Sequence, residues 1–364
     1  MNILETNMIL LFFSSTLLLF ILKTKITKVL FLIIISIQFI IINGLRDVTV
    51  GVDTFRYSLH FSRIRAITNW DNFIDYDTEI GYKVYQWIIG LFTSNVNMYL
   101  LLTATLLFTL LAKFIYKNST NIFLSYFIFI SLGFFDFTLS GIRQSIAMLI
   151  GLYTYEYALK KQKTKFLLVV LLAASFHYSA LILLPIYFLV NFNLNNKYLL
   201  LIMPIYFLTT IFSDQIGSLL TSVYYGELSI LDMYDSSGTI GTMSIFILIV
   251  LIIGYIFHPP AHPNTTKEHK ALFNIVLFSF FIQTLSSVMY LFTRLNMNYL
   301  IFLIIYIPLL LEKSPDSTFS LEPKLVWSAK KVFYYSVVVV FSVYLIINIQ
   351  NNAGRLLPYN FFWE

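Results

Sequence analysis

The chain has 364 residues, of which 58% are hydrophobic and only 12% are charged, and its formal net charge is +6. This composition excludes a soluble globular domain and indicates a protein that crosses a membrane several times. The absence of cysteine excludes disulfides, thiolate metal sites and a cysteine nucleophile. No soluble basic domain is present to carry a nucleic acid, so we attribute the positive charge to membrane topology.

Apolar runs follow one another along most of the chain, and each is a candidate transmembrane helix. In chain order the predicted spans are 8–22, 29–45, 96–112, 121–138, 142–159, 165–176, 178–192, 198–213, 241–257, 271–291, 297–311 and 332–349. The segment 80–92 is interpreted instead as a re-entrant or interfacial amphipathic helix. We therefore expect a single integral-membrane domain over residues 1–364, an all-α polytopic membrane protein with about 12 transmembrane helices, some short or re-entrant.

Lysine and arginine are segregated along this series of spans. Sixteen of the seventeen lysines lie in one alternating set of loops and all seven arginines lie in the other, with Lys83 as the exception. Because positive charge favours the cytoplasmic side, the lysine loops are predicted to be cytoplasmic and the termini external. The two long external loops are then 46–95 and 214–240. The arginines, whose planar fork suits carboxylate and diphosphate, are the candidates for substrate binding.

The first candidate motif lies where the second span emerges, and it runs from Arg46 to Tyr57. Gly51 can turn the backbone tightly, which brings Arg46, Asp53 and Arg56 toward one another. Charges gathered at the mouth of a span are costly unless they are used, which favours a functional interpretation. The competing structural interpretation is an Arg–Asp network that only closes the loop.

The second motif begins at Ser140 and places Arg143 and Gln144 in the first turn of a span. Ser140 is expected to cap this helix. Arg143 has the wrong sign for the positive end of the helix dipole, so it requires an anionic partner. That partner is either a substrate phosphate, which we favour, or Asp136.

Two further motifs are short. His177 lies at the break between two helices that are each too short to cross the membrane, so it is either a functional histidine or a hydrogen-bonding group at a helix break. Arg294 and Tyr299 lie in an external segment near the start of the predicted span 297–311, and the competing structural interpretation is a polar turn between two helices. His258 and His262 flank two prolines and do not have helical metal-ligand spacing, and no nucleotide motif occurs, so neither a metal nor a cofactor is expected.

Together these motifs resemble the EpsG family of polysaccharide polymerases, relatives of the Wzy O-antigen and capsule polymerases. The resemblance is carried in order by Arg46–Tyr57, Asp77–Tyr82, Ser140–Ala147, Phe176–Ser179 and Arg294–Tyr299. It does not extend to the loop 214–240. The resemblance implies a multi-pass protein of the bacterial inner membrane whose active site faces the periplasm.

The implied reaction moves a growing glycan as a block from undecaprenyl diphosphate onto a lipid-linked repeat unit, building O-antigen, capsule or exopolysaccharide. The implied partners are these lipid-linked glycans, membrane lipid, and the chain-length regulator and flippase of the pathway. The departing diphosphate needs convergent cationic donors, for which Arg46, Arg143 and Arg294 are candidates. His177 is the favoured base, with Asp53 positioning because arginines lower the basicity of a carboxylate.

Other candidate substrate contacts share their motifs with these charged groups: Gly51, Arg56, Tyr57, Gln144 and Tyr299.

Three other functions are compatible with parts of the pattern. A glycan ligase uses the same donor and differs only in its acceptor. A membrane sugar acyltransferase requires a cytoplasmic acyl donor, whereas the cytoplasmic loops here offer only lysines. A flippase should carry charges at mid-membrane depth, whereas the charges here lie at the outer ends of the spans.

Overall fold

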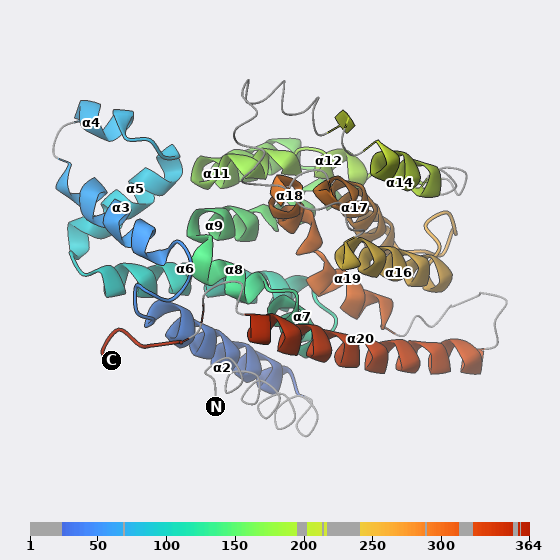
Figure 1. The fold of residues 1–364 in the computed structure, drawn as a ribbon. Coiled ribbons are helices and arrows are strands. Elements are labelled where there is room, and N and C mark those ends of the chain that lie inside the picture. Colours follow the sequence, from blue (N-terminus) through green and yellow to red (C-terminus); the bar gives the residue numbers. More distant parts are fainter. Residues whose placement is uncertain are drawn as a thin grey trace. The chain divides into compact units, whose positions relative to one another are not determined.

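The computed structural model describes residues 24–67, 70–194, 202–212, 215–216, 241–287, 290–312, 323–351, 356 and 358–364. All regular elements in these residues are helices, which confirms the all-α class (Figure 1). The same residues contain one isolated antiparallel bridge, between Arg46 and Phe361. The predicted span 8–22 lies outside the described residues, as does the loop 214–240 apart from residues 215–216.

The chain forms two compact units, and the first is drawn from Met1–Tyr153, Val169–Leu181 and Val332–Glu364. Its helices are α2 (Lys25–Gly44), α3 (Thr54–Ala66), α4 (Trp70–Asp75), α5 (Ile80–Phe92), α6 (Val96–Asn118), α7 (Ile122–Ser131), α8 (Phe134–Ser140), α9 (Ile142–Gly151), the end of α11 (Lys163–Phe176) and most of α20 (Pro323–Asn351).

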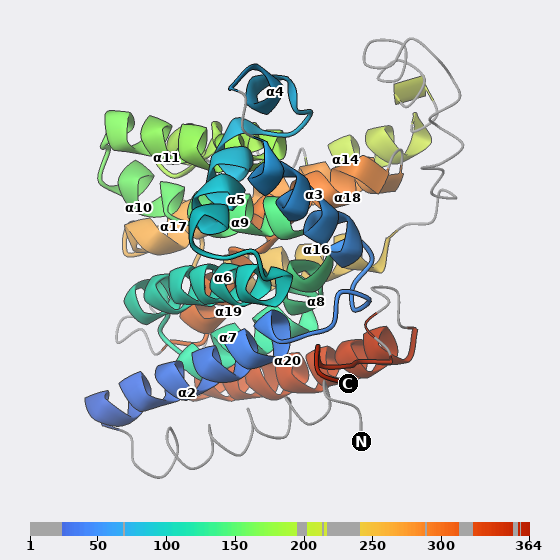
Figure 2. The ribbon, with the colours of Figure 1, turned by 90° about the vertical axis from the view of Figure 1, so that its left-hand side faces the viewer.

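An aromatic cluster between α2 and α6 forms the centre of this first unit. The Phe39 ring lies 5.2 Å from that of Phe108, 5.6 Å from that of Tyr126 and 4.8 Å from that of Phe135. Helix α2 packs along α6 (Figure 2), and Gly44 permits the close approach, because a Cβ there would lie 2.8 Å from the Leu101 Cα. This packing holds the loop that follows α2 in place.

The second unit is drawn from Thr154–Leu168 and Ile182–Lys331. Its helices are α10 (Thr154–Leu159), the start of α11, the end of the 3₁₀ helix η2 (Tyr178–Leu183), α12 (Ile186–Leu189), α14 (Ile202–Ile211), α16 (Thr242–Phe257), α17 (Lys267–Thr284), the 3₁₀ helix η4 (Leu285–Ser287), α18 (Tyr290–Leu300), α19 (Leu303–Leu310) and the start of α20.

Helix α17 is the central helix of the second unit and packs against both α16 and α18. Its Ser279 hydroxyl donates to the Asn296 side chain of α18 at 2.8 Å, and the Asn296 amide donates to Gln283 at 2.7 Å. The Asn274 amide donates to the carbonyl oxygens of Leu189 and Phe192 at 2.8 and 2.9 Å. These buried bonds fix the end of α12 against α17.

Fewer helices than predicted are long enough to cross a membrane. Three are long and apolar enough, Lys25–Gly44, Val96–Asn118 and Ser328–Ile347, and the number reaches five if two bent pairs each count as one span. The pairs are Ile122–Ser131 with Phe134–Ser140, bent by 56°, and Leu291–Leu300 with Leu303–Leu310, bent by 48°. The prediction of about 12 spans is therefore not confirmed for the described residues.

Breaks in the backbone account for much of this difference. The predicted span 121–138 is divided at Gly133, whose φ of 76° ends α7, because a left-handed residue stops a helix. The predicted span 142–159 is divided into α9 and α10, and 178–192 becomes η2 followed by α12. Long apolar composition therefore does not make each of these segments a single straight helix.

Helix α5 was predicted over 80–92 as an amphipathic helix, and its helical bounds are confirmed. Its apolar face is exposed and its polar face is buried, which is the opposite of a helix on the surface of a soluble protein. Large apolar side chains such as Trp87, Leu91 and Phe92 are exposed, whereas Lys83 and Gln86 are buried. Such an outward apolar face is expected of a helix that contacts lipid.

Lys83 also explains why one lysine departs from the segregation of charge. Its ammonium donates to the carbonyl oxygens of Ile74 and Tyr76 at 2.8 and 2.9 Å. These carbonyls lie at the end of α4, where a helix leaves acceptors unpaired. Lys83 therefore caps α4.

Candidate functional site

The site is built around Glu79, the residue that immediately precedes α5 in the first unit. Glu79 occupies the N-cap position, yet its side chain makes no capping hydrogen bond. Gly81, in the first turn, lies against α11: a Cβ there would be 2.8 Å from the Ser175 carbonyl oxygen. The missing side chain allows this end of α5 to reach the end of α11, and His177 directly follows that helix.

Glu79 joins two residues that the sequence motifs singled out separately. Its Oε2 lies 2.5 Å from Nη1 of Arg143, and its Oε1 lies 2.7 Å from Nδ1 of His177. The Glu79 side chain is only 5% exposed, whereas those of Arg143 and His177 are each 29% exposed. We call these three residues the Glu79 cluster. Its carboxylate is enclosed, and both of its partners remain accessible to a substrate.

The contacts within the Glu79 cluster determine which of its groups carry protons. Burial alone would raise the pKa of Glu79, but the hydrogen bond from His177 and the charge of Arg143 outweigh it and lower this pKa to about 2. Glu79 is thus ionised at neutral pH and can only accept, so the Nδ1 of His177 must be the protonated nitrogen. The Nε2 of His177 is left as the nitrogen that can accept a proton.

Arg143 lies in the first turn of α9, as predicted, but its anionic partner is Glu79 rather than Asp136. Its Nη1 also donates to the Thr78 hydroxyl at 2.9 Å. The expectation that Ser140 caps this helix is wrong, because Gly141 is the N-cap residue. The Ser140 hydroxyl accepts instead from the backbone of Val52 at 3.2 Å, which ties the loop after α2 to this region.

Tyr57 and Asp53 extend the charged surroundings of Arg143. Tyr57 is buried on α3, and burial raises its pKa, while the charge of Arg143 acts in the opposite direction. The charge of Asp53, at the start of α3, also acts on Tyr57. The structure therefore brings together Asp53, Tyr57, Arg143 and His177, four of the residues predicted from the sequence.

Further arginines lie close to His60 on α3. Burial lowers the pKa of His60, and the charges of Arg143, Arg56 and Arg63 lower it further. Arg56 is exposed on α3. The charge of Asp77 acts on the pKa of His60 in the opposite direction, so this side of α3 carries both guanidinium and carboxylate groups.

Arg46 forms a second cluster in the same unit, and its surroundings differ. Its side chain is fully buried; it donates to the backbone and side-chain oxygens of Asn43, the latter at 2.9 Å, and to the Leu139 carbonyl oxygen at 3.1 Å. Burial lowers the pKa of Arg46 to about 10. We call these contacts the Arg46 cluster. They join the end of α2 to the end of α8, and substrate binding by Arg46 stays a prediction.

Gly51 makes the tight turn that was predicted for it. Its φ is 93°, and a Cβ would also collide with the Leu139 carbonyl oxygen. The hydroxyl of Thr54 donates to the same carbonyl at 2.9 Å. Gly51 thus holds the loop between α2 and α3 against α8, and its prediction as a substrate contact is not tested by this arrangement.

The remaining predicted residues lie elsewhere. Gln144 is buried in α9 beside Arg143 in sequence. Arg294 and Tyr299 belong to α18 in the second unit; Arg294 is exposed, and the buried Tyr299 hydroxyl donates to the Ile182 carbonyl oxygen at 2.5 Å. Their roles in substrate binding stay predictions.

Glu79 and Thr78 were not among the residues predicted from the sequence to bind or react. They lie 64 and 65 positions from Arg143, and Glu79 lies 98 positions from His177, so no local pattern connects them. One signal was present: a glutamate at the N-cap of an amphipathic helix within the stretch Asp77–Tyr82. In the described part of the chain, no group of three or more His, Asp or Glu residues is placed to hold a metal ion.

Comparison with known proteins identifies the family. The model of the EpsG family matches residues 28–361, which include the Glu79 cluster, the Arg46 cluster and α18. Searches of curated proteins and of solved structures found no match. Because the family match covers nearly the whole chain, this membrane protein belongs to the EpsG family, which is associated with polysaccharide polymerases.

Proposed function

We propose that this protein polymerises undecaprenyl-diphosphate-linked repeat units into a surface polysaccharide at the periplasmic face of the inner membrane. Family membership supports the class of reaction. The observation that carries the proposal is the Glu79 cluster, in which one enclosed carboxylate orients a histidine and an arginine that both remain accessible. This arrangement supplies a base and an anion-binding group side by side.

The proposed reaction is a glycosyl transfer. A hydroxyl oxygen on the non-reducing sugar of one lipid-linked repeat unit attacks the anomeric carbon of the growing glycan. The bond from that carbon to the diphosphate oxygen breaks, and undecaprenyl diphosphate leaves with the electron pair. The hydroxyl proton passes to Nε2 of His177, and Glu79 stabilises the imidazolium that forms.

Arg143 provides the group that binds the diphosphate in this proposal. Its Nη1 is directed to Glu79 and Thr78, and Tyr57 also bonds to its guanidinium; the N–H groups that remain can donate to phosphate oxygens. Negative charge develops on the leaving diphosphate, and donors fixed in advance lower the barrier because they need no reorganisation. Glu79 fixes the orientation of Arg143 through its 2.5 Å contact.

Asp53 is assigned a positioning role. It lies near Tyr57 and thus near the Arg143 side of the cluster, but the carboxylate bonded to His177 is that of Glu79. A chain-length regulator and the flippase of the same pathway are the proposed protein partners. The polymerase is assigned no metal or other cofactor.

A deletion strain tests the class of function. A gel of surface polysaccharide from a strain that lacks this gene should show one repeat unit attached and no ladder. A ligase would leave no repeat unit attached, and a flippase would leave none at the surface. Either of those patterns would contradict the proposed polymerase.

The purified protein tests the chemistry. With lipid-linked repeat units as substrate, His177→Gln should slow polymerisation by about a hundred- to ten-thousandfold, because glutamine keeps a hydrogen bond but accepts no proton near neutral pH. Asp53→Asn is the comparison. Full-length polymer from His177→Gln, with none from Asp53→Asn, would move the base to Asp53 and leave His177 with a structural role.

A further inference from the structure

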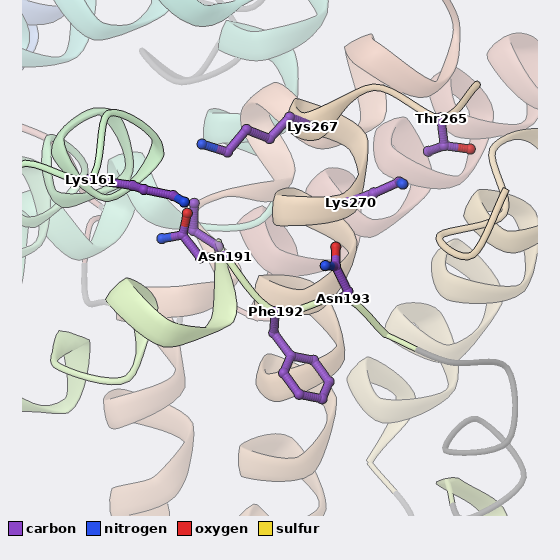
Figure 3. Close-up of a pocket in the computed structure, with 8 residues that line it drawn as sticks. Lys161, Asn191, Phe192, Asn193, Thr265, Lys267 and Lys270 are labelled. Atoms are coloured by element: carbon purple, nitrogen blue, oxygen red, sulfur yellow. The ribbon is translucent and has the colours of Figure 1, made fainter. Parts of the chain in front are cut away.

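A basic pocket in the second unit is not used by the proposed reaction. It has a volume of about 460 Å³ and is lined by eight described residues: Lys161, Val190, Asn191, Phe192, Asn193, Thr265, Lys267 and Lys270. Three of these are cationic and none is acidic. Figure 3 shows Lys161 and Lys267 extending toward one another from opposite sides, while Lys270 extends toward Thr265.

Three separate chain segments are bonded together to make this pocket. The Lys267 ammonium, at the start of α17, donates to the Leu159 carbonyl oxygen at the end of α10. The Asn191 amide, just after α12, donates to the Ala158 carbonyl oxygen at 3.2 Å. These contacts hold Lys161 and Lys267 close to one another although like charges repel, which favours an anion between them.

The backbone of Lys161 points to the same conclusion. Lys161 has a φ of 55°, the one non-glycine residue with a positive φ in the described chain. It ends α10: its N–H donates to Ala158 at 3.0 Å, and that of Gln162 donates to Tyr157 at 2.9 Å. Glycine is the residue usually found at this position of a helix terminus. A lysine here puts a cation into the pocket at a position where glycine would fit the backbone better.

The start of α17 adds a second reason for an anion. Lys267 and Lys270 lie in the first turn, where the helix dipole is positive and cations are unfavourable. An anion in the pocket would interact with both lysines and with the helix terminus.

Apolar rings beside the lysines indicate the source of that anion. Phe192, which lines the pocket, and Phe188, on the adjacent α12, are 48% and 74% exposed. Exposed phenylalanines next to lysines are expected at the boundary between the lipid head groups and the acyl chains. The distribution of lysines in the sequence assigns these loops to the cytoplasmic leaflet, where anionic lipids meet basic pockets.

We propose that this pocket binds the phosphate head group of an anionic glycerophospholipid, with Lys161 and Lys267 contacting the phosphate and Phe192 lying against the acyl chains. None of its residues takes part in the proposed polymerisation. The proposed lipid site can therefore be tested independently of the proposed catalytic residues.

Native mass spectrometry of the purified full-length protein tests the proposal, with phosphatidylglycerol, phosphatidylcholine or inorganic phosphate added. Phosphatidylglycerol should bind most tightly. Lys161→Gly and Lys267→Gln should each weaken its binding by about fivefold, and the double variant by the product of the two. Lys163→Gln is the matched control, because Lys163 is an exposed lysine of the same segment that does not line the pocket.

Lys161→Gly separates binding from folding, because glycine suits the left-handed backbone and should leave the melting temperature without lipid unchanged or higher. Three results would overturn the proposal. They are equal binding of phosphatidylglycerol and phosphatidylcholine, unchanged phosphatidylglycerol binding by the double variant, and equal weakening by Lys163→Gln. Lysine-dependent binding of inorganic phosphate that matches that of phosphatidylglycerol would assign the pocket to free phosphate instead of lipid.

Discussion

Arg143 and Arg46 are both arginines at the mouths of predicted spans, yet the structure places them in opposite surroundings. Arg143 is partly exposed and pairs with a carboxylate, whereas Arg46 is fully buried and donates to neutral oxygens of Asn43 and Leu139. A buried arginine bonded to carbonyls joins helices. An accessible arginine held by a carboxylate keeps donors in a fixed orientation for a ligand.

The two clusters therefore differ in partner and in accessibility within one unit. Gly51 supports the Arg46 cluster by bringing the loop against α8, and Gly81 supports the Glu79 cluster by bringing α5 against α11. The difference also shows why residue type and position in the sequence are insufficient to assign a role. The partner and the accessibility of each arginine decide what it can do.

Among the variants that test this comparison, loss of the Glu79 charge should have the largest effect on the polymerisation rate. Glu79→Gln removes the acceptor that fixes the His177 tautomer and stabilises its imidazolium, so polymerisation should slow by about a hundred- to ten-thousandfold. The assay is polymer formation by purified protein. Asp75→Asn, an exposed acid at the end of α4, is the control and should remain active. Normal polymer from Glu79→Gln would remove the Glu79 cluster from the mechanism.

Replacing each arginine by lysine tests the two clusters directly. Arg143→Lys should lower the polymerisation rate by roughly a hundredfold while the protein accumulates normally, because a point charge cannot reproduce the oriented donors. Arg46→Lys should instead cost about 1–3 kcal/mol of stability, because buried acceptors lose their donors. Melting temperature and activity per folded molecule distinguish these results. A stable Arg46→Lys protein without activity would assign Arg46 to substrate binding, as the sequence motif predicts.

The close approach of α5 to α11 can be tested with alanine. Gly81→Ala places a methyl group against the Ser175 backbone, so it should cost about 1–3 kcal/mol of stability and move Glu79 away from His177. Gly90→Ala in the same helix is the matched control, because the shortest contact of its methyl group is with Cγ of the exposed Arg65 side chain, which can move. Equal melting temperatures and activities for the two variants would contradict the role assigned to Gly81.

The smallest expected effect is on stability at acid pH. The folded-state pKa of Glu79, about 2, lies below its ordinary value of 4.5. The stability that this shift contributes is present above about pH 4.5 and is lost as the pH falls toward 2. Melting temperatures of wild type should therefore fall more steeply than those of Glu79→Gln across this window. Parallel curves would show that Glu79 does not carry the shift.

Local patterns predicted the parts of the fold that depend on nearby residues. The segment 80–92 was predicted as an amphipathic helix with the bounds that α5 has, and the break at His177 was recognised from two short apolar runs on either side. Gly133 was available as the signal that α7 ends, but apolar composition continued across it and predicted one span. Periodicity describes which segments are apolar more reliably than where they bend.

The site was predicted only in part, because its central residue is defined by contacts between distant segments. Arg143 and His177 were identified from their own motifs. Glu79 acquires its role only when Gly81 brings α5 against α11, a packing contact with no counterpart in local sequence. The burial of Arg46 among carbonyl oxygens likewise depends on contacts between distant segments, because Leu139 lies 93 positions away in the sequence.

The outward apolar face of α5 has a consequence for how a substrate reaches Glu79. A donor anchored by a polyprenyl tail does not leave the bilayer, so its search is two-dimensional. Trp87, Leu91 and Phe92 present a surface along which such a tail can slide, and Glu79 stands at the N-terminal end of the same helix. In the proposed reaction, the hydrocarbon chain stays in the lipid beside α5 while the diphosphate at its end reaches Arg143.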